Sequence, residues 1–443
     1  MAMTLKYCVV LIDKKIPETR MSVAKIRASS FRDTRTKIIE ISVVETLSIR
    51  SDTYRYMTTL AGLTLSILLF SLSANLAHAT TNSAVWSLEQ RSPFNVKDQE
   101  TKTQAYHPLK HAKQAWKICT LVPHLKDAYW IGIDYGLVQH AKALNITLDL
   151  FEAGSYYGKD KQLGQLSHCM NGDYDAILLG AVDPKLLSSF HQPITKPVIA
   201  LVNRIDNRKV TTRIGVNWYQ MGWLAGNFIK QDVEQGNAGQ ASVALLTGPE
   251  KMGGSEWVEE GIKAALQLSP DAKPASTNSL KSSKITISSI RYADNNRNLY
   301  RDQLHYLLKD QTPDYILGSA VAIEAAVGQL AITQASQASK LTSQPEQEPV
   351  SKIKLVSSYL SPAVLRGLFR NRVAFSSDDS VVLQGKLAID VVVRELEGAK
   401  SFGDIGPAIQ GLQGDVLKKY QLTDSLAPAE FYPIYRVKSN KKL

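Results

Sequence analysis

The sequence predicts an α/β protein built as two doubly wound parallel-sheet lobes. Short, continuous Val/Ile/Leu-rich runs recur after residue 113, as expected for parallel strands that are buried on both faces. Stretches with helical periodicity lie between these runs, and the alternation indicates successive βα units. The units are too many for one sheet of ordinary width, so two lobes are expected.

The expected elements follow one another along the chain. The strands are 117–122, 146–151, 174–180, 197–202, 242–247, 284–290, 313–318, 353–359 and 372–376. The first helix carries a buried stripe made of Trp130, Ile133, Leu137, Ala141 and Leu144. Further helices are expected near 159–171, 219–233, 255–267, 295–308, 322–333 and 380–398. Two polar stretches, 269–283 and 333–352, are typical of surface insertions.

The positive charge of the chain is unevenly distributed. The formal net charge is +11 over 443 residues, but residues 1–56 alone hold 11 Lys/Arg against 6 Asp/Glu. The rest of the chain has no block of clustered Lys and Arg with interleaved aromatic residues, which a nucleic-acid surface needs. We therefore expect no nucleic-acid partner.

Residues 50–79 have the pattern of a secretory signal peptide. Arg50 and Arg55 precede an apolar run from about residue 60 to 72, and the segment ends in Ala77-His78-Ala79. The run is short for a membrane span, so we expect cleavage after Ala79, export to the periplasm and no membrane insertion of the mature protein. Such a signal leaves residues 1–49 unexplained, and a translation start placed too far upstream is the simplest account.

Two cysteines remain in the exported part, Cys119 and Cys169. Cys119 lies early in an expected strand, and Cys169 ends the helix that returns to the same edge of the sheet. In an oxidising compartment this placement makes them a candidate disulfide. Two buried free thiols would give the same sequence pattern, so both alternatives stay open.

The sequence carries no signature of catalysis. It lacks the G-x-S-x-G, H-E-x-x-H, G-x-x-x-x-G-K-[ST] and C-x-x-C motifs, and its eight His residues show no metal-ligand spacing. We therefore predict a protein that is not an enzyme and that uses no metal and no cofactor. A secreted hydrolase with an unfamiliar site is the alternative from another class, and it would need paired carboxylates in a cleft.

Ligands of open parallel sheets bind beyond the carboxyl ends of the strands. Aromatic side chains dominate these positions, and no nucleophile stands beside a base. Such a cleft is suited to binding rather than to reaction. The residues at the expected strand ends are Asp127, Tyr129, Trp130, Tyr156, Tyr157, Asp183, Asn203, Arg204, Trp218, Trp257, Ser319 and Tyr359.

Three blocks resemble the type I periplasmic binding proteins of ribose-binding type: 115-AWKICTLVPHLKDAYW-130, 176-AILLGAVDP-184 and 215-GVNWYQMGWLAG-226. The resemblance covers about 113–436. It implies two lobes joined by three crossings, near 216–219, 374–377 and 402–406. The implied organisation is an N-terminal segment at 80–112, a first lobe of 113–217 and 375–403, a second lobe of 218–374 and 404–436, and a tail at 437–443.

Within that family the sequence is similar to members that sense trimethylamine N-oxide for a membrane sensor histidine kinase. The resemblance implies that the ligand lies in the interlobe cleft, that the partner is the periplasmic sensor domain of the kinase, and that genes for respiration with this compound are controlled. It implies a ligand-binding set of Asp127, Tyr129, Trp130, Tyr156, Trp218 and Tyr359. Arg204, Trp223 and Trp257 form a second, weaker set.

The chemistry of these residues agrees with such a ligand. A methylated, positively charged nitrogen is attracted to the electron-rich faces of Trp and Tyr rings. The alternative within the same fold is the solute-binding component of a ribose-type sugar importer. A sugar site needs several carboxylates and amides, whereas three of the strand ends here carry Asn203, Ser319 and Tyr359.

Overall fold

The computed structural model describes residues 8–12, 20–26, 41–48, 85–94, 97–236, 240–266, 285–341 and 353–440. The chain divides into two compact units, residues 1–82 and residues 83–443. In the first unit, strands β1 (Cys8–Ile12), β2 (Arg20–Ile26) and β3 (Ile41–Ser48) form an antiparallel sheet. The segment 50–79, expected to be a signal peptide, lies outside the described residues.

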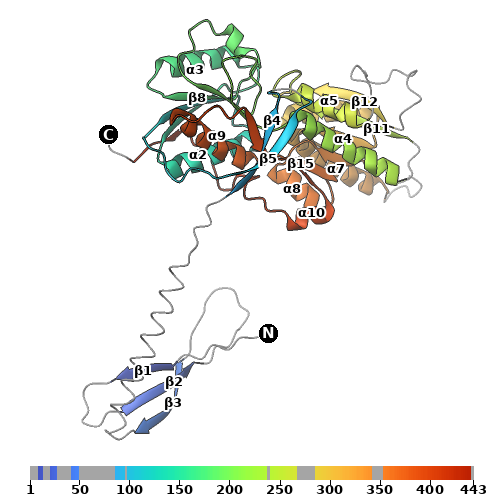
Figure 1. Ribbon diagram of the computed structural model, residues 1–443. Helices are drawn as coiled ribbons and strands as arrows, with labels where there is room; N and C mark the ends of the chain where they lie inside the picture. Colours follow the sequence, from blue (N-terminus) through green and yellow to red (C-terminus); the bar gives the residue numbers. More distant parts are fainter. Residues whose placement is uncertain are drawn as a thin grey trace. The chain divides into compact units, whose positions relative to one another are not determined.

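The second unit contains both lobes, and each lobe has its own sheet (Figure 1). The nine-stranded sheet of the first lobe has the order β18-β7-β6-β8-β9-β10-β16-β4-β5. Its six parallel strands are β6 (Lys117–Val122), β7 (Thr147–Glu152), β8 (Ala176–Leu179), β9 (Val198–Leu201), β10 (Arg213–Ile214) and β16 (Asp404–Pro407). The antiparallel edges are β18 (Arg436–Val437) and a hairpin of β4 (Trp86–Ser92) and β5 (Glu100–Tyr106).

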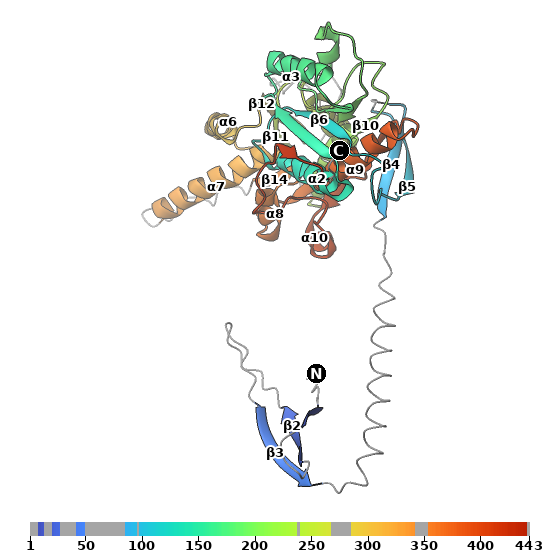
Figure 2. The same cartoon turned by 90° about the vertical axis from the view of Figure 1, so that its left-hand side faces the viewer.

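Helices cover both faces of the first sheet, and successive side chains of each strand point to opposite faces. Ala176 and Leu178 of β8 face a core shared with α2 (Ala128–Leu144) and α9 (Val381–Leu396). Ile177 and Leu179 face the opposite core with α3 (Lys159–Asn171) and the 3-10 helix η1 (Leu186–Ser189). Figure 2 shows α3 on one side of β6, with α2 and α9 on the other. Burial on both faces explains why these strands are continuously apolar.

The second lobe repeats this plan with a six-stranded sheet of order β12-β11-β13-β14-β15-β17. The strands are β11 (Ala241–Thr247), β12 (Ile285–Tyr292), β13 (Tyr315–Gly318), β14 (Lys354–Ser357), β15 (Phe375–Asp378) and the antiparallel β17 (Gln410–Leu412). Helices α4 (Trp218–Gln235) and α5 (Ser255–Ala265) cover one face. Helices α6 (Arg297–Asp310), α7 (Ala320–Leu341), α8 (Pro362–Phe369) and α10 (Gly414–Lys419) contribute to the core of the other.

The chain passes between the sheets at slightly different places from those expected. It enters the second lobe after Ile214, leaves it after Asp378, re-enters after Pro407, and returns once more to the first sheet at β18. Thus 375–378 belongs to the second sheet and 404–407 to the first, opposite to the limits read from the sequence. Strands of two to four residues are too short to show a periodic pattern, which explains the displacement.

One expected insertion is shorter than predicted. Helix α7 continues to Leu341, so the first part of 333–352 is helical. The segment 333-TQASQASKL-341 is polar but contains Ala, Gln, Lys and Leu, which are good helix formers. The other expected insertion, 269–283, lies outside the described residues.

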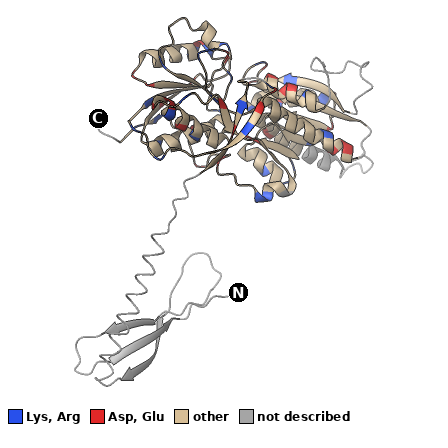
Figure 3. Ribbon diagram, in the orientation of Figure 1, with Lys and Arg blue, Asp and Glu red and all other residues tan. Residues whose placement is uncertain are grey.

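Charged residues of both signs are interspersed over the ribbon of the two lobes (Figure 3). Within the described part of the chain, no helix combines the length and apolarity needed to cross a bilayer.

Candidate functional site

The first side of the site is built by the loop from β6 into α2. The Asp127 side chain caps α2 by accepting a hydrogen bond of 3.1 Å from the backbone N–H of Trp130. This cap fixes the start of the helix at the carboxyl edge of the sheet. Tyr129 and Trp130 therefore lie in its first turn, and both are buried.

Hydrogen bonds hold the aromatic side chains of this side. The hydroxyl of Tyr129 donates to Oδ2 of Asp379 at 2.7 Å. Nε1 of Trp130 donates to the hydroxyl of Tyr156 at 3.3 Å, and Nδ2 of Asn203 donates to the same hydroxyl at 3.4 Å. Tyr156 is 4% exposed whereas Tyr157 is 63% exposed, which settles which of the two adjacent tyrosines faces inward.

The second lobe brings two further rings to the same place. Trp218 begins α4, at the first crossing between the lobes, and Tyr359 follows β14. The ring of Tyr359 lies edge-on to Tyr129, with 5.2 Å between the centroids. Nε1 of Trp218 and the hydroxyl of Tyr359 are buried and have no hydrogen-bond partner among the described residues.

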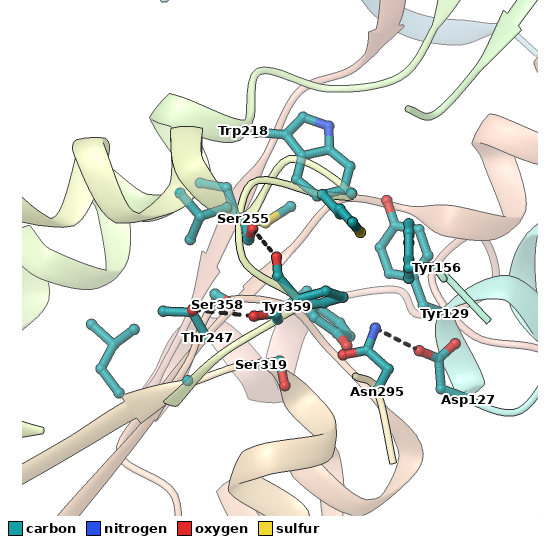
Figure 4. Close-up of a pocket in the computed structure, with 18 of the residues that line it drawn as sticks. Asp127, Tyr129, Tyr156, Trp218, Thr247, Ser255, Asn295, Ser319, Ser358 and Tyr359 are labelled. Atoms are coloured by element: carbon teal, nitrogen blue, oxygen red, sulfur yellow. Dashed lines mark hydrogen bonds between the residues drawn. The ribbon is translucent and has the colours of Figure 1, made fainter. Parts of the chain in front are cut away.

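These side chains enclose one cavity between the lobes, with a volume of about 60 Å³. By this measure one water needs about 10–15 Å³, so the space suits a ligand of about five heavy atoms. All six residues of the main sequence-derived set line it. Figure 4 labels Asp127, Tyr129, Tyr156, Trp218 and Tyr359 among them. The other lining residues are Met221, Thr247, Gly248, Pro249, Met252, Gly253, Ser255, Val258, Ile262, Asn295, Leu317, Gly318, Ser319 and Ser358.

Among the described lining residues, Asp127 is the only Asp, Glu, Lys, Arg or His. Burial raises the pKa of its carboxyl group, while His124 and the hydrogen bonds from Trp130 and Asn295 act in the opposite direction. Nδ2 of Asn295, from the second lobe, donates to Oδ2 of Asp127 at 3.2 Å (Figure 4). Asp127 thus joins the two lobes while its carboxyl group borders the cavity.

Burial also raises the pKa of the Tyr129 and Tyr359 hydroxyls well above the ordinary tyrosine value. Both hydroxyls therefore remain protonated near neutral pH, and each can act as a hydrogen-bond donor. Tyr129 already donates to Asp379, whereas the Tyr359 hydroxyl has no hydrogen-bond partner among the described residues and can donate to a ligand.

Arg204, Trp223 and Trp257, the weaker set, do not line this cavity. Arg204 forms ion pairs with Asp206 and Glu256, both at 3.1 Å, and its guanidinium lies 5.1 Å from the centre of the Trp257 ring. These contacts engage both Arg204 and Trp257 outside the cavity. Trp223 lies more than one helical turn beyond Trp218 in α4, so it is displaced away from the cavity.

A disulfide joins Cys119 of β6 to Cys169 of α3. It lies in the first-lobe core, away from the cavity-lining residues. No group of three or more metal-ligating side chains occurs in the described ranges.

Sequence reasoning missed several residues that complete the cavity. Asn295 follows β12, and Met252 and Gly253 lie in the loop between β11 and α5. The segment 247-TGPEKMGGSEW-257 has the sequence pattern of a strand-to-helix loop at the carboxyl edge and carries no further motif. Its Gly-Gly pair was the available signal, because adjacent glycines indicate a close backbone approach.

Comparisons with known proteins agree with this architecture. Residues 118–400 match the family model described as a periplasmic binding protein domain. Periplasmic protein TorT of Escherichia coli strain K12 is 33% identical over 338 residues, which cover 76% of this chain and 89% of that protein.

Solved structures give the same relationship. A chain in the complex of the TorS sensor domain with TorT in the presence of TMAO is 33% identical, with a TM-score of 0.56 over 72% of this chain and 99% of that one. An ABC transporter solute-binding protein from Bradyrhizobium sp. BTAi1 with bound Bis-Tris is 26% identical, with a TM-score of 0.63 over 81% of this chain and 100% of that one. The expected two-lobed fold is confirmed, and the chain belongs to the periplasmic binding proteins.

Proposed function

We propose that this protein binds trimethylamine N-oxide in the cavity between its lobes. We further propose that the ligand-bound protein signals to the periplasmic sensor domain of a membrane histidine kinase. The relatives similar over most of the chain include a TorT that was solved with the TorS sensor domain in the presence of TMAO. In this proposal the protein has no catalytic role, and the kinase controls genes for respiration with the bound compound.

The observation that carries the proposal is the composition of one small cavity. Five aromatic rings from both lobes and a single carboxyl group surround about 60 Å³. Trimethylamine N-oxide has five heavy atoms, and its three methyl groups surround a positive nitrogen. Each ring face would contribute about 0.5–2 kcal/mol to holding such a group, depending on how completely water is excluded.

The oxygen of the ligand needs a hydrogen-bond donor. The Tyr359 hydroxyl is buried at the cavity and has no hydrogen-bond partner among the described residues. Asp127 is a second source, because burial raises its pKa and a protonated carboxyl group donates. In its ionised form Asp127 would instead face the positive methyl groups.

A titration of the purified protein with trimethylamine N-oxide, ribose and glycine betaine, followed by tryptophan fluorescence, tests the ligand. We expect trimethylamine N-oxide to bind most tightly. Preferential binding of ribose would reassign the protein to the sugar-importer class. Hexoses and pentoses carry about ten or more heavy atoms, which is more than a cavity of about 60 Å³ suits.

The partner is tested separately with the purified periplasmic domain of the cognate kinase. We expect a complex in size-exclusion chromatography and an affinity that changes when trimethylamine N-oxide is added, since a ligand can signal only through differential binding. Equal affinity with and without ligand, or no complex at all, would remove the signalling part of the proposal.

A further inference from the structure

The loop between β11 and α5, residues 248–254, forms the roof of the cavity. Gly248, Pro249, Met252 and Gly253 of this loop line the space. The Ser255 hydroxyl donates to the backbone oxygen of Pro249 at 2.5 Å and closes the loop on itself. The roof therefore has a defined shape and does not depend on a ligand to hold it.

Two adjacent glycines allow this roof to lie directly on two of the rings. A Cβ at Gly253 would stand 2.7 Å from Cζ and 2.8 Å from the hydroxyl oxygen of Tyr156. A Cβ at Gly254 would stand 2.0 Å from Cε3 of Trp218. Atoms of these types do not approach so closely, so any side chain at either position must push the roof or the ring away.

The backbone conformation at the pair is also special. The φ angles are +55° at Gly253 and +78° at Gly254, in the left-handed region that glycine adopts at little cost. The same loop reaches across to the first lobe, since Met252 packs against the core that contains Tyr156. Just beyond it, Glu256 forms the ion pair with Arg204 of the first lobe. The roof is thus one of the places where the second lobe contacts the first.

We propose that the Gly253–Gly254 turn determines the size specificity of the site. This inference rests on the proposed function and adds the residues that limit ligand size. Because Gly253 and Gly254 have no side chains, the roof lies directly on the Tyr156 and Trp218 rings. The cavity is then small enough for a trimethylated nitrogen to contact both rings on closure. A Cβ at either position holds the roof off these rings, which weakens contact with a small ligand and leaves room for a longer one.

The test compares Gly253→Ala and Gly254→Ala with Gly398→Ala and Gly403→Ala in the full-length protein. Gly398 and Gly403 also have positive φ, at +95° and +66°, but a Cβ there would meet no atom within 4 Å. The controls therefore reproduce the backbone strain without the ring contact. Calorimetric titration with trimethylamine N-oxide and with glycine betaine gives both dissociation constants, and thermal unfolding reports folding.

We expect the two roof variants to lose about tenfold or more in trimethylamine N-oxide affinity, which is about 1.4 kcal/mol. The affinity for glycine betaine should fall less, so the ratio of the two dissociation constants moves closer to one. Both control variants should keep the wild-type ratio. If a roof variant unfolds, Gly253→Asn or Gly254→Asn replaces it, because Asn tolerates positive φ and still carries a Cβ.

Folded roof variants with wild-type affinities and an unchanged preference would overturn the inference while leaving the proposed function intact. A wild-type protein that does not bind trimethylamine N-oxide would instead refute the proposed function, and the size-specificity inference would fall with it. An equal loss for both ligands would show that the turn supports closure but does not select by size, which also overturns the inference.

Discussion

The two sides of the cavity are built on different principles. On the first-lobe side Tyr129, Trp130 and Tyr156 are buried, and each is held by a hydrogen bond. On the second-lobe side the lining combines glycine backbone, small hydroxyl groups and apolar side chains, and the indole Nε1 of Trp218 and the hydroxyl of Tyr359 have no hydrogen-bond partner among the described residues. Buried, satisfied networks are rigid. The first lobe therefore provides a preformed wall, and the second provides the surfaces that complete it on closure.

The largest effect is expected when the most buried ring of the preformed first-lobe wall is removed. Trp130→Ala should lower the free energy of unfolding by about 3–5 kcal/mol, because it leaves a large cavity in the first-lobe core. It should also weaken trimethylamine N-oxide binding by at least about tenfold. Urea unfolding and fluorescence titration measure the two effects.

Trp223→Ala is the matched control for that experiment. Trp223 is partly buried in α4 and lies outside the cavity, so its loss should reduce stability but not affinity. Equal affinities in the wild-type and Trp130→Ala proteins would exclude Trp130 from the binding surface.

The buried acid behind Tyr129 makes the wall sensitive to pH. Burial, reinforced by Asp378, raises the pKa of Asp379 to about 7 from an ordinary value of 3.8. Between these values the folded state keeps a proton that the unfolded state has released. The contribution of Asp379 to the free energy of unfolding is therefore greatest below about pH 4 and falls by up to about 1.4 kcal/mol per pH unit as the pH rises to 7.

Asp379→Asn keeps an oxygen that can accept from Tyr129 and removes the titration. Urea unfolding between pH 4.5 and 7.5 should show that the wild type loses stability relative to this variant as the pH rises. The remaining carboxyl groups, including Asp134 with its pKa also raised to about 7 by burial, are common to both proteins. Parallel pH profiles for the two would contradict the assignment.

Tyr359 tests the side that completes the cavity. Tyr359→Ala should weaken trimethylamine N-oxide binding by about tenfold, or about 1.4 kcal/mol, with a smaller loss of stability than Trp130→Ala because Tyr359 is only partly buried. Tyr359→Phe isolates the contribution of the hydroxyl. Tyr306, which is 59% exposed on α6, provides the control, and a Tyr306→Ala variant with the same loss would show that the effect is not specific to the cavity.

The smallest effect is expected at the ion pair between the lobes. Arg204→Ala removes a partly exposed pair with Glu256, so affinity should fall by about two- to fivefold. The difference from wild type should shrink between about 50 mM and about 500 mM salt, as screening predicts. Arg301→Ala, which removes an exposed pair within α6, should leave the affinity unchanged. A loss that does not depend on salt would indicate a packing role for Arg204 over Trp257.

The sequence predicted the walls of the cavity better than its roof. Asp127, Tyr129, Trp130, Tyr156 and Tyr359 stand directly after buried strands, and the carboxyl ends of parallel strands meet at one edge of a sheet. The strand periodicity therefore places the first four of these residues together, whereas Tyr359 lies at the corresponding edge of the second sheet and joins them only when the two lobes meet. The periodicity left open which of Tyr156 and Tyr157 faces inward; the family resemblance implied Tyr156, and this is the tyrosine that the structure buries.

What the sequence could not predict depends on contacts between the lobes. Asn295, Met252 and the contacts of Gly253 and Gly254 arise only when two surfaces from different sheets meet. Arg204, of the weaker set, pairs with Asp206 of its own lobe and with Glu256 of the other lobe, and the second of these contacts likewise exists only where the lobes meet. The short strands β10, β16 and β18 were missed because two to four residues are too few to show a periodic pattern.

The position of β18 has a consequence for the order of folding. Arg436 and Val437 pair with β7 of the first lobe, whereas the strands of the second lobe all lie within 241–412. Since domains tend to fold as units once their residues are available, the lobe that starts first along the chain is completed last. Shortening the chain by its final ten residues should consequently expose the β7 edge and impair the amino-terminal half of the molecule, far from the cut in sequence.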